Sequence, residues 1–264
     1  MKIAAVQMIS GPQVAPNLVT AARLIAEAAA AGAKLVVLPE YFPLIDATDE
    51  ARLAARERFG SGPLQDFLAD LAAKHGIWLV GGSIPLATAE PNKLLNTCLV
   101  FDDGGRRVAR YDKIHLFAFN KGEERYDEAK TIEAGSSVVS VDTPFGRLGL
   151  AICYDLRFPE LFRAMGRVDV IALPAAFTET TGQAHWRVLL RARAIENQCY
   201  LVAAAQGGRH PTGRVTHGNS LIVDPWGEVI ADMDKGEGVV SAELDRARVA
   251  EIRTNLPALE HRRL

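Results

Sequence analysis

Three side chains that could take part in catalysis stand directly after stretches predicted to be buried strands. Glu40 and Lys113 each come two residues after such a strand, and Cys153 follows the apolar run 147–152 without a gap. Ligands in open α/β sheets bind at the carboxyl ends of strands. The three side chains therefore stand where a single site could hold them together.

Together, the three residue types fit one chemistry. A cysteine thiol becomes a nucleophile when a base removes its proton, and a glutamate in a dry site, such as Glu40, can have its pKa raised towards neutrality and act as that base. The Lys113 ammonium would stabilise the negative charge of a tetrahedral intermediate, with the backbone N–H of Tyr154 as a second donor. With Cys153 as the nucleophile, this set suits acyl transfer at an amide or nitrile carbon.

Taken singly, each of these residues also has an ordinary structural explanation. Cysteine is among the residues most often buried, so Cys153 could belong to the core. Glu40 could be a solvated loop residue, and Lys113 could pair with Asp112 at the surface. In favour of a reactive thiol, a helix is predicted to begin at about Phe158, and its positive end would favour a thiolate at Cys153.

Apolar spacing and turn residues predict the elements that must position these side chains. Short apolar runs bounded by turn residues predict strands at residues 2–8, 34–38, 77–81, 97–101, 107–111, 138–141, 147–152, 168–173, 200–205, 219–223, 228–231 and 239–244. Helical spacing, with Pro63 in a first turn and Gly76 after a last one, predicts the helices. They are expected at residues 17–31, 49–59, 63–75, 158–165 and 183–198, with a last helix capped by Asp245.

The order of these elements predicts the fold class. A strand–helix–strand unit within the first 40 residues is followed by hairpins and then by a second β-α-β segment. No linker or repeat divides the chain, so residues 1–264 are expected to form one α/β domain with mixed sheets covered by helices. The polar stretch 120–135 is predicted to be a loop over a site, and 206–213 a Gly- and Pro-rich loop. Periodicity alone leaves one sheet or two open.

Composition limits the partners. The formal net charge is −2 and no long Lys/Arg block occurs, which argues against a nucleic-acid or membrane surface and favours a small-molecule substrate. The three cysteines lack C-x-x-C spacing, so neither a disulfide framework nor a zinc site is expected. The chain opens on a predicted strand and contains no run long enough to span a membrane, which predicts a cytoplasmic protein.

Three stretches of the sequence carry a resemblance to a known family. They are residues 38–41 (LPEY), 111–117 (YDKIHLF) and 153–160 (CYDLRFPE). In this order they resemble the signature stretches of the nitrilase-like carbon–nitrogen hydrolases. The resemblance implies an α-β-β-α sandwich, with two sheets packed face to face and helices outside. It also implies Glu40 as general base, Lys113 as electrostatic stabiliser and Cys153 as the nucleophile that forms a thioester.

The resemblance implies further properties of the site. A second glutamate lies near the triad in this family, and the setting of residues 125–129 assigns that role to Glu128 rather than to Glu123 or Glu124. A carboxylate near Lys113 would keep the ammonium charged and oriented. No metal or organic cofactor is implied. A homodimer or larger homo-oligomer is expected.

Several other stretches point to one branch of the family. Residues 182–186, 189–200, 203–206, 224–227 and 261–263 look most like the deaminated-glutathione amidase branch. That branch cleaves the amide joining an oxoglutaramyl group to cysteine. The nearest alternative is ω-amidase, which releases ammonia from 2-oxoglutaramate, and another amidase or a carbamoylase is a further one. An alternative from another class is a non-catalytic scaffold with a vestigial site.

Deaminated glutathione and 2-oxoglutaramate both carry carboxylates, so a guanidinium is expected in the pocket. Arg157, four residues after the nucleophile, is the first candidate for substrate binding, although it could instead pair with Asp155 or Glu160. Further candidates on predicted loops are Arg125, Arg209 and Arg214. Tyr154 and Phe177 are also expected to contact the substrate, Phe177 as a wall of the pocket.

Overall fold

Two β-sheets form the centre of the molecule in a computed structural model, which describes residues 1–122 and 124–263. The first sheet contains β1 (Lys2–Gln7), β2 (Leu35–Val37), β3 (Trp78–Val80), β4 (Ile84–Ala87), β5 (Leu94–Phe101), β6 (Arg107–Asp112) and β17 (Gly238–Glu243). Its order is β17-β1-β2-β3-β5-β4, with β6 paired to β5. The strands β1, β2 and β3 are parallel, and β17 and β5 are antiparallel to their neighbours.

The second sheet has the order β16-β15-β12-β11-β10-β9. Its strands are β9 (Ser140–Thr143), β10 (Gly146–Leu150), β11 (Val170–Ala175), β12 (Tyr200–Ala205), β15 (Leu221–Val223) and β16 (Val229–Asp232). The central strands β10, β11 and β12 are parallel. Strands β11 and β12 are buried along their whole length. This burial explains their uninterrupted apolar sequences, because strands covered on both faces need no alternation of polar residues.

The alternation of side chains along β1 shows how the layers are built. Ile3 and Ala5 belong to the core between the two sheets, whereas Ala4 and Val6 belong to a second core under the helices. Successive residues of a strand point to opposite faces, so one strand serves both cores. The helices α1 (Val14–Ala30) and α3 (Pro63–His75) cover the outer face of the first sheet.

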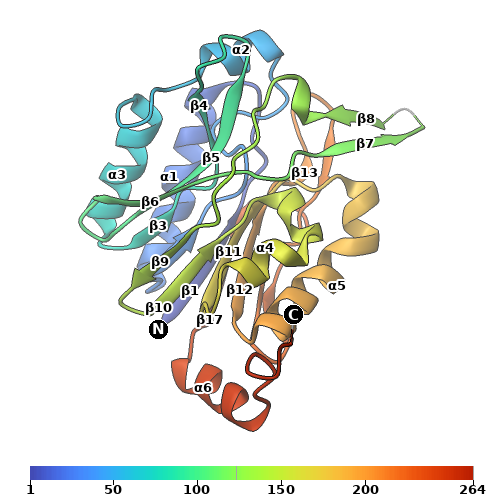
Figure 1. Ribbon diagram of the computed structural model, residues 1–264. Helices are drawn as coiled ribbons and strands as arrows, with labels where there is room; N and C mark the ends of the chain where they lie inside the picture. The colour runs from blue at the N-terminus through green and yellow to red at the C-terminus, as the bar shows by residue number, and fades with distance from the viewer. Residues whose placement is uncertain (123, 264) are drawn as a thin grey trace.

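The outer face of the second sheet is covered by α4 (Pro159–Ala164) and α5 (Glu179–Asn197). Helix α5 buries Trp186, Leu190 and Ala194, which recur every fourth residue and so form one stripe. Figure 1 shows α1 and α3 on one side of the paired sheets and α5 on the other. The predicted four-layer α-β-β-α sandwich is confirmed, and α6 (Arg246–Asn255) follows the last strand.

The two sheets meet at the carboxyl ends of their central strands. Met8, after β1, and Gln206, after β12, form a parallel bridge. The Gln206 side chain donates to the hydroxyl oxygen of Ser10 at 2.9 Å and to the backbone carbonyl of Glu40 at 3.1 Å. The ends of strands from both sheets are thereby held at one edge, where the residues after β2 and β10 also lie.

Two stretches predicted to be loops contain strands. Residues 120–135 include most of a hairpin formed by β7 (Ala118–Lys121) and β8 (Glu124–Asp127), followed by the 3₁₀ turn η1 (Glu128–Lys130). Figure 1 shows this hairpin extending away from the sheets. Its strands are largely exposed, so they lack the apolar pattern on which a strand prediction depends.

The second such stretch, 206–213, contains β13 (Gly207–Arg209), which pairs with β14 (Val215–His217). Glycine is depleted in strands, which hides β13 from a propensity argument. Strand β4 was likewise not predicted, and α2 (Asp49–Ala54) is shorter than the expected helix at 49–59. Within the described residues, no helix is both long enough and apolar enough to cross a membrane.

Candidate active site

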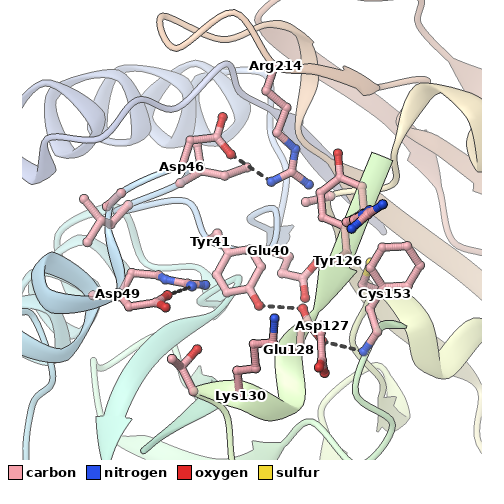
Figure 2. Close-up of a pocket in the computed structure, with 18 residues that line it drawn as sticks. Glu40, Tyr41, Asp46, Asp49, Tyr126, Asp127, Glu128, Lys130, Cys153 and Arg214 are labelled. Carbon is pink, nitrogen blue, oxygen red and sulfur yellow. Dashed lines mark hydrogen bonds and ion pairs between the residues drawn. The ribbon is translucent and has the colours of Figure 1, made fainter. Parts of the chain in front are cut away.

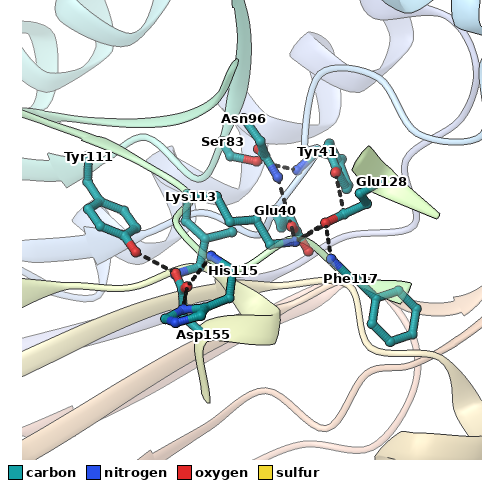
Figure 3. A network of polar contacts seen from close by, with 11 residues as sticks. Glu40, Tyr41, Ser83, Asn96, Tyr111, Lys113, His115, Phe117, Glu128 and Asp155 are labelled. Atoms are coloured by element: carbon teal, nitrogen blue, oxygen red, sulfur yellow. Dashed lines mark hydrogen bonds and ion pairs between the residues drawn. The ribbon is translucent and has the colours of Figure 1, made fainter. Parts of the chain in front are cut away.

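A buried lysine between two carboxylates forms the centre of the site (Figure 3). Lys113 Nζ lies 2.8 Å from Glu40 Oε1, and 3.0 and 2.8 Å from Glu128 Oε1 and Oε2. The Lys113 side chain is 0% exposed and that of Glu40 1%. Neither residue is at the surface, which was the alternative interpretation of each from the sequence. Charges buried this deeply are costly unless paired, so the three groups stabilise one another.

The strand β5 fixes the backbone at Lys113. The Lys113 N–H donates to the Asn96 carbonyl at 2.9 Å, continuing the pairing of β5 and β6 by one residue. Asp112, the alternative partner for the lysine, instead pairs with Arg110 at 3.0 Å. Side chains alternate across a strand, so Asp112 and Lys113 point to opposite faces. This alternation separates the buried ammonium from the aspartate beside it in sequence.

Cys153 lies at a sharp turn between β10 and the 3₁₀ helix η2 (Cys153–Arg157). Its φ is +50°, in the left-handed region that a residue other than glycine adopts at a cost. The Glu40 carboxylate lies near enough to raise the pKa of the thiol, and Glu40, Ala176 and Cys153 line the same cavity. Cys153 is 7% exposed and lines two adjoining cavities, so it is buried yet accessible to a small molecule.

Asp155 anchors this turn. Its carboxylate accepts hydrogen bonds from the Ile152 N–H at 2.8 Å and the Tyr111 hydroxyl at 2.6 Å. The backbone N–H of His115 donates to it at 3.1 Å, and His115 Nδ1 lies 2.7 Å away. Asp155 is fully buried. Its contacts tie the turn at Cys153 to the segment that carries Lys113.

Glu128 is held by more than Lys113. Its Oε1 accepts from the Tyr41 hydroxyl and its Oε2 from the Phe117 N–H, each at 2.7 Å. Burial would raise the pKa of Glu128, but the Lys113 ammonium and these donors outweigh it and lower the pKa. Glu124 lies elsewhere, accepting from Thr180 at 2.9 Å. Glu123 is outside the described residues.

The pKa values of the other two charged groups, Glu40 and Lys113, are both raised. Burial raises the pKa of Glu40, although Lys113 partly offsets the effect. For Lys113, burial would lower the pKa, but Glu128 and Glu40 raise it well above its usual value. The lysine therefore stays charged, and Glu40 binds a proton more readily than an exposed glutamate does.

The surroundings of Cys153 favour the protonated thiol over the thiolate. Burial, followed by the nearby Glu40 carboxylate, raises the pKa of Cys153 well above its usual value. This differs from the thiolate that a helix N-terminus was expected to favour. The predicted helix is α4, which begins at Pro159, next to its expected start, and spans six residues. A base is needed before this thiol can attack.

Two cavities meet at Cys153, and Figure 2 shows the larger of them. The larger has a volume of about 300 Å³, and Glu40 and Glu128 line it. The smaller, called the slot below, has about 10 Å³, which is room for about one water molecule. The slot is lined by Cys153, Phe117, Tyr154, Arg157, Ala176, Phe177, Thr178 and Thr181.

All three residues expected to bind substrate therefore line the slot. The Arg157 guanidinium carbon lies 5.7 Å from the ring centre of Tyr154 and 5.3 Å from that of Phe177. Its polar partner is His185 Nδ1 at 3.1 Å, instead of the expected alternatives Asp155 or Glu160. Among the other candidate arginines, Arg125 and Arg214 line the larger cavity, whereas Arg209 lines neither.

Three polar residues of the site were missed by sequence reasoning. Asn96 donates to Glu40 Oε1 at 2.9 Å, Tyr41 donates to Glu128, and Asp155 anchors the turn. Tyr41 and Asp155 lie inside the signature stretches, so their positions were a usable signal. Asn96 lies in the middle of a strand, and its partner is 56 residues away in sequence. In the described chain, no group of three or more His, Cys, Asp or Glu is arranged to hold a metal ion.

Comparisons with known proteins identify the family to which the chain belongs. A family model described as carbon-nitrogen hydrolase matches residues 2–254. The deaminated glutathione amidase of Yersinia enterocolitica is 40% identical over 266 residues, covering 99% of this chain and 92% of the relative. Omega-amidase NIT2-A of Xenopus laevis is 40% identical over 265 residues, covering 99% and 95%.

A solved structure extends the agreement to the backbone. Saccharomyces cerevisiae Nit3, a member of branch 10 of the nitrilase superfamily, superposes with a TM-score of 0.90 at 34% identity. The match covers 100% of this chain and 97% of that one. With a family model spanning nearly its whole length, the chain belongs to the carbon–nitrogen hydrolase family.

Proposed function

We propose that this protein is an amidase that hydrolyses a linear amide of a small, carboxylate-bearing substrate through a thioester on Cys153. The observation that carries the proposal is that one buried carboxylate, Glu40, contacts the Lys113 ammonium and lines the same cavity as Cys153. A nucleophile, a base and a fixed positive charge are thus adjacent at a cavity that holds a small molecule.

In the first step, Glu40 removes the thiol proton. The raised pKa of Cys153 makes this transfer necessary, and the raised pKa of Glu40 makes it a stronger base than an exposed glutamate. Glu40 Oε1 is already engaged by Lys113 and Asn96. Its other oxygen is therefore the one that receives the proton.

Cys153 Sγ then attacks the amide carbon, and negative charge develops on the amide oxygen. The Lys113 ammonium and the Tyr154 N–H stabilise that charge. Tyr154 lies in the first turn of η2, where backbone N–H groups have no acceptor within the helix. As the C–N bond breaks, protonated Glu40 gives its proton to the leaving nitrogen, and the acyl group remains as a thioester.

A water molecule completes the cycle. Glu40, again a carboxylate, takes a proton from water, whose oxygen attacks the thioester carbon. The carboxylic acid departs and the proton returns to the Cys153 sulfur. Glu128 contributes by holding Lys113 charged and in place, because it binds the ammonium through both of its oxygens. No step requires a cofactor.

For the substrate we propose deaminated glutathione, after the relatives named deaminated glutathione amidase. Its acyl carboxylate would bind Arg157, with Phe177 as a wall of the slot. The slot has only about 10 Å³, so the Arg157 side chain must move to admit the acyl chain. The second candidate is 2-oxoglutaramate, after the omega-amidase relative at the same 40% identity. We further propose a cytoplasmic enzyme that forms a homodimer or larger homo-oligomer.

An amide panel tests the proposal. Deaminated glutathione, 2-oxoglutaramate, a nitrile and an N-carbamoyl amino acid are compared, with Cys153→Ala as the inactive variant. Cys98→Ala is the matched control, because Cys98 is also a buried free thiol but lies in the core between the sheets. We expect amide turnover and an acyl adduct on Cys153 by mass spectrometry. Faster turnover of the nitrile, or turnover by Cys153→Ala, would contradict the proposal.

A further inference from the structure

The two cavities that meet at Cys153 differ in their relation to the acid–base group. Glu40 lines the larger cavity, whereas the slot touches Cys153 without touching Glu40. In the proposed function, on which this inference rests, Glu40 protonates the leaving nitrogen. The nitrogen and whatever is attached to it must therefore lie in the larger cavity, with the acyl group towards the slot.

The larger cavity has far more room than ammonia requires. Its volume is about 300 Å³, whereas one water-sized molecule needs only about 10–15 Å³ on the same measure. A leaving group the size of several amino-acid residues fits such a space. The size of the cavity thus favours a substituted amide, which releases an amine, over a primary amide, which releases ammonia.

One cation in the wall of this cavity is held in a fixed position. Arg214, between β13 and β14, pairs through Nη1 with Asp46 at 2.8 Å, and its guanidinium carbon lies 5.1 Å from the Tyr126 ring centre. Figure 2 shows this pair at the edge of the cavity above Tyr41. The Arg214 side chain is 25% exposed and that of Asp46 12%. The second anchor of Asp46 is the Thr212 hydroxyl at 2.7 Å.

The ion pair leaves part of the guanidinium unused. Asp46 engages Nη1, and among residues 1–122 and 124–263 neither Nε nor Nη2 of Arg214 has a hydrogen-bond partner. A guanidinium already held on one side loses little conformational freedom when it binds an anion on the other. Arg52 in the same wall is likewise paired on one side, with Asp49, and its Nε also has no partner in the described chain. The Arg214 guanidinium differs in that it also lies over the Tyr126 ring, and Arg125 and Lys130 are exposed at the rim.

We propose that the larger cavity receives an amine leaving group that bears a carboxylate, as an amino acid or peptide does, and that Arg214 binds this carboxylate. Arg214 is then a specificity-determining residue that acts on the leaving group, while Arg157 acts on the acyl group. Contact with a carboxylate remote from the reacting carbon is equal in the ground and transition states. It therefore lowers KM and leaves kcat nearly unchanged.

Three substrates that share the same acyl group but differ in the leaving group test the contact between Arg214 and the carboxylate. Deaminated glutathione has a dipeptide leaving group with a carboxylate, an analogue with glycine replaced by methylamine lacks the carboxylate, and 2-oxoglutaramate releases ammonia. We expect Arg214→Gln to raise KM for deaminated glutathione about 10- to 100-fold, as the loss of a charged hydrogen bond does. KM for the other two substrates should change less than about twofold, and wild type should prefer the acid over its methylamide by the same factor.

Arg209→Gln is the matched control. Arg209 precedes Arg214 on the same β13–β14 segment but lines neither cavity, and it bonds the Gly213 carbonyl at 3.1 Å. This variant should leave all three substrates unchanged. An equal loss on all three substrates in Arg214→Gln would overturn the assignment, as would a selective loss in Arg52→Gln or Arg125→Gln with none in Arg214→Gln.

Binding to an inactive variant separates this inference from the proposed function. Cys153→Ala is titrated with deaminated glutathione and with its methylamide analogue by calorimetry, with and without Arg214→Gln. Weaker binding of the acid alone, by about 10- to 100-fold, supports the role of Arg214 even where the wild-type enzyme turns over none of the three substrates. Equal affinity of both variants for both ligands overturns it, whatever the result of the turnover assay.

Discussion

Glu40 Oε1 accepts hydrogen bonds from two donors, and this arrangement decides how the carboxylate can act. Lys113 Nζ lies 2.8 Å away and Asn96 Nδ2 2.9 Å away. Asn96 is almost fully buried, and its own Oδ1 has no partner among the described residues. A buried acceptor without a partner costs stability. The orientation of Glu40 that Asn96 provides is a functional reason to retain it.

Asn96→Ala should impair the base without removing it. Loss of a donor to the carboxylate raises the pKa of Glu40 further, because the hydrogen bond favours the charged form. Wild-type kcat/KM should fall on the acid side at a pH above 4.5, the ordinary glutamate value, since burial already raises this pKa. In Asn96→Ala that limb should move to higher pH, and kcat should fall roughly 10- to 100-fold.

The pH–rate profile with the amide substrate measures both effects. Asn92→Ala is the control, because Asn92 is exposed just before the same strand. A uniform loss of kcat across the pH range, with no movement of the acid limb, would assign Asn96 a purely structural role.

Glu128→Gln should act on the lysine instead. Glu128 is the strongest of the groups that raise the pKa of Lys113, so its neutralisation lowers that pKa. We expect kcat to fall by roughly 100-fold and the alkaline limb of the pH–rate profile to move to lower pH. Glu124→Gln, on the same hairpin but bonded to Thr180, is the control. An unchanged alkaline limb would show that Glu128 does not sustain the charge of Lys113.

At the scale of elements, the turn at Cys153 depends on a contact between a strand of the first sheet and the 3₁₀ helix that follows a strand of the second. Tyr111 on β6 donates from its hydroxyl to Asp155 in η2 at 2.6 Å. The left-handed backbone of Cys153 is a strained conformation that its surroundings must hold. The first sheet thus helps to fix Cys153, the proposed nucleophile, which the second sheet carries.

Tyr111→Phe should weaken this anchor. The buried carboxylate of Asp155 loses one donor, which destabilises the fold by about 1–3 kcal/mol. Because the turn is then less well held, kcat should fall more than KM rises. Urea unfolding at neutral pH and steady-state kinetics measure the two effects. Full stability together with full kcat would show that the remaining contacts of Asp155 are sufficient.

The elements differ in how far sequence could predict them. The helix at 63–75 was predicted with the bounds that α3 has, because Pro63 starts it and Gly76, at φ +58°, ends it. Buried strands were found by their apolar runs. The β7–β8 hairpin was missed because its strands are largely exposed, and β13 because it is short and rich in glycine.

The residues of the site also differ in how far sequence could predict them. Glu40, Lys113 and Cys153 were predicted because their stretches resemble a family, and residue chemistry added a reason for each. Sequence alone could not identify Asn96 as a residue of the site, nor rank Arg214 above the other candidate arginines. The partner of Asn96 is 56 residues away and that of Arg214 is 168 residues away in sequence. Contacts of this kind arise only when the sheets pack together.

At the scale of the whole molecule, the packing of two sheets assembles the site. Glu40 and Lys113 follow strands of the first sheet, and Cys153 follows a strand of the second. Gln206 joins the two edges through Ser10 and the Glu40 backbone. Such packing excludes water from Glu40, and that exclusion raises its pKa. The free energy gained by packing the two sheets therefore also offsets the cost of burying the Glu40 carboxylate.

Glu40→Gln should relieve that cost. Because the pKa of Glu40 is higher in the folded than in the unfolded chain, the folded state keeps a proton that the unfolded state has released. Stability therefore falls as pH rises from about 4.5 through the folded-state pKa. Glutamine has nearly the same shape and no charge to bury. The variant should match wild type at acid pH and exceed it at neutral pH, while kcat falls by roughly 10²- to 10⁴-fold.

Thermal unfolding from acid to neutral pH measures the difference. The Tm of Glu40→Gln should rise above that of wild type by roughly 2–4 °C for each kcal/mol relieved, and the gap should widen as pH increases. Glu90→Gln, at an exposed position, should show no such trend. The ion pair with Lys113 opposes the gain, since Lys113 lowers the pKa of Glu40. If wild type is the more stable protein at neutral pH, that ion pair outweighs burial and Glu40 contributes to stability as well as to catalysis.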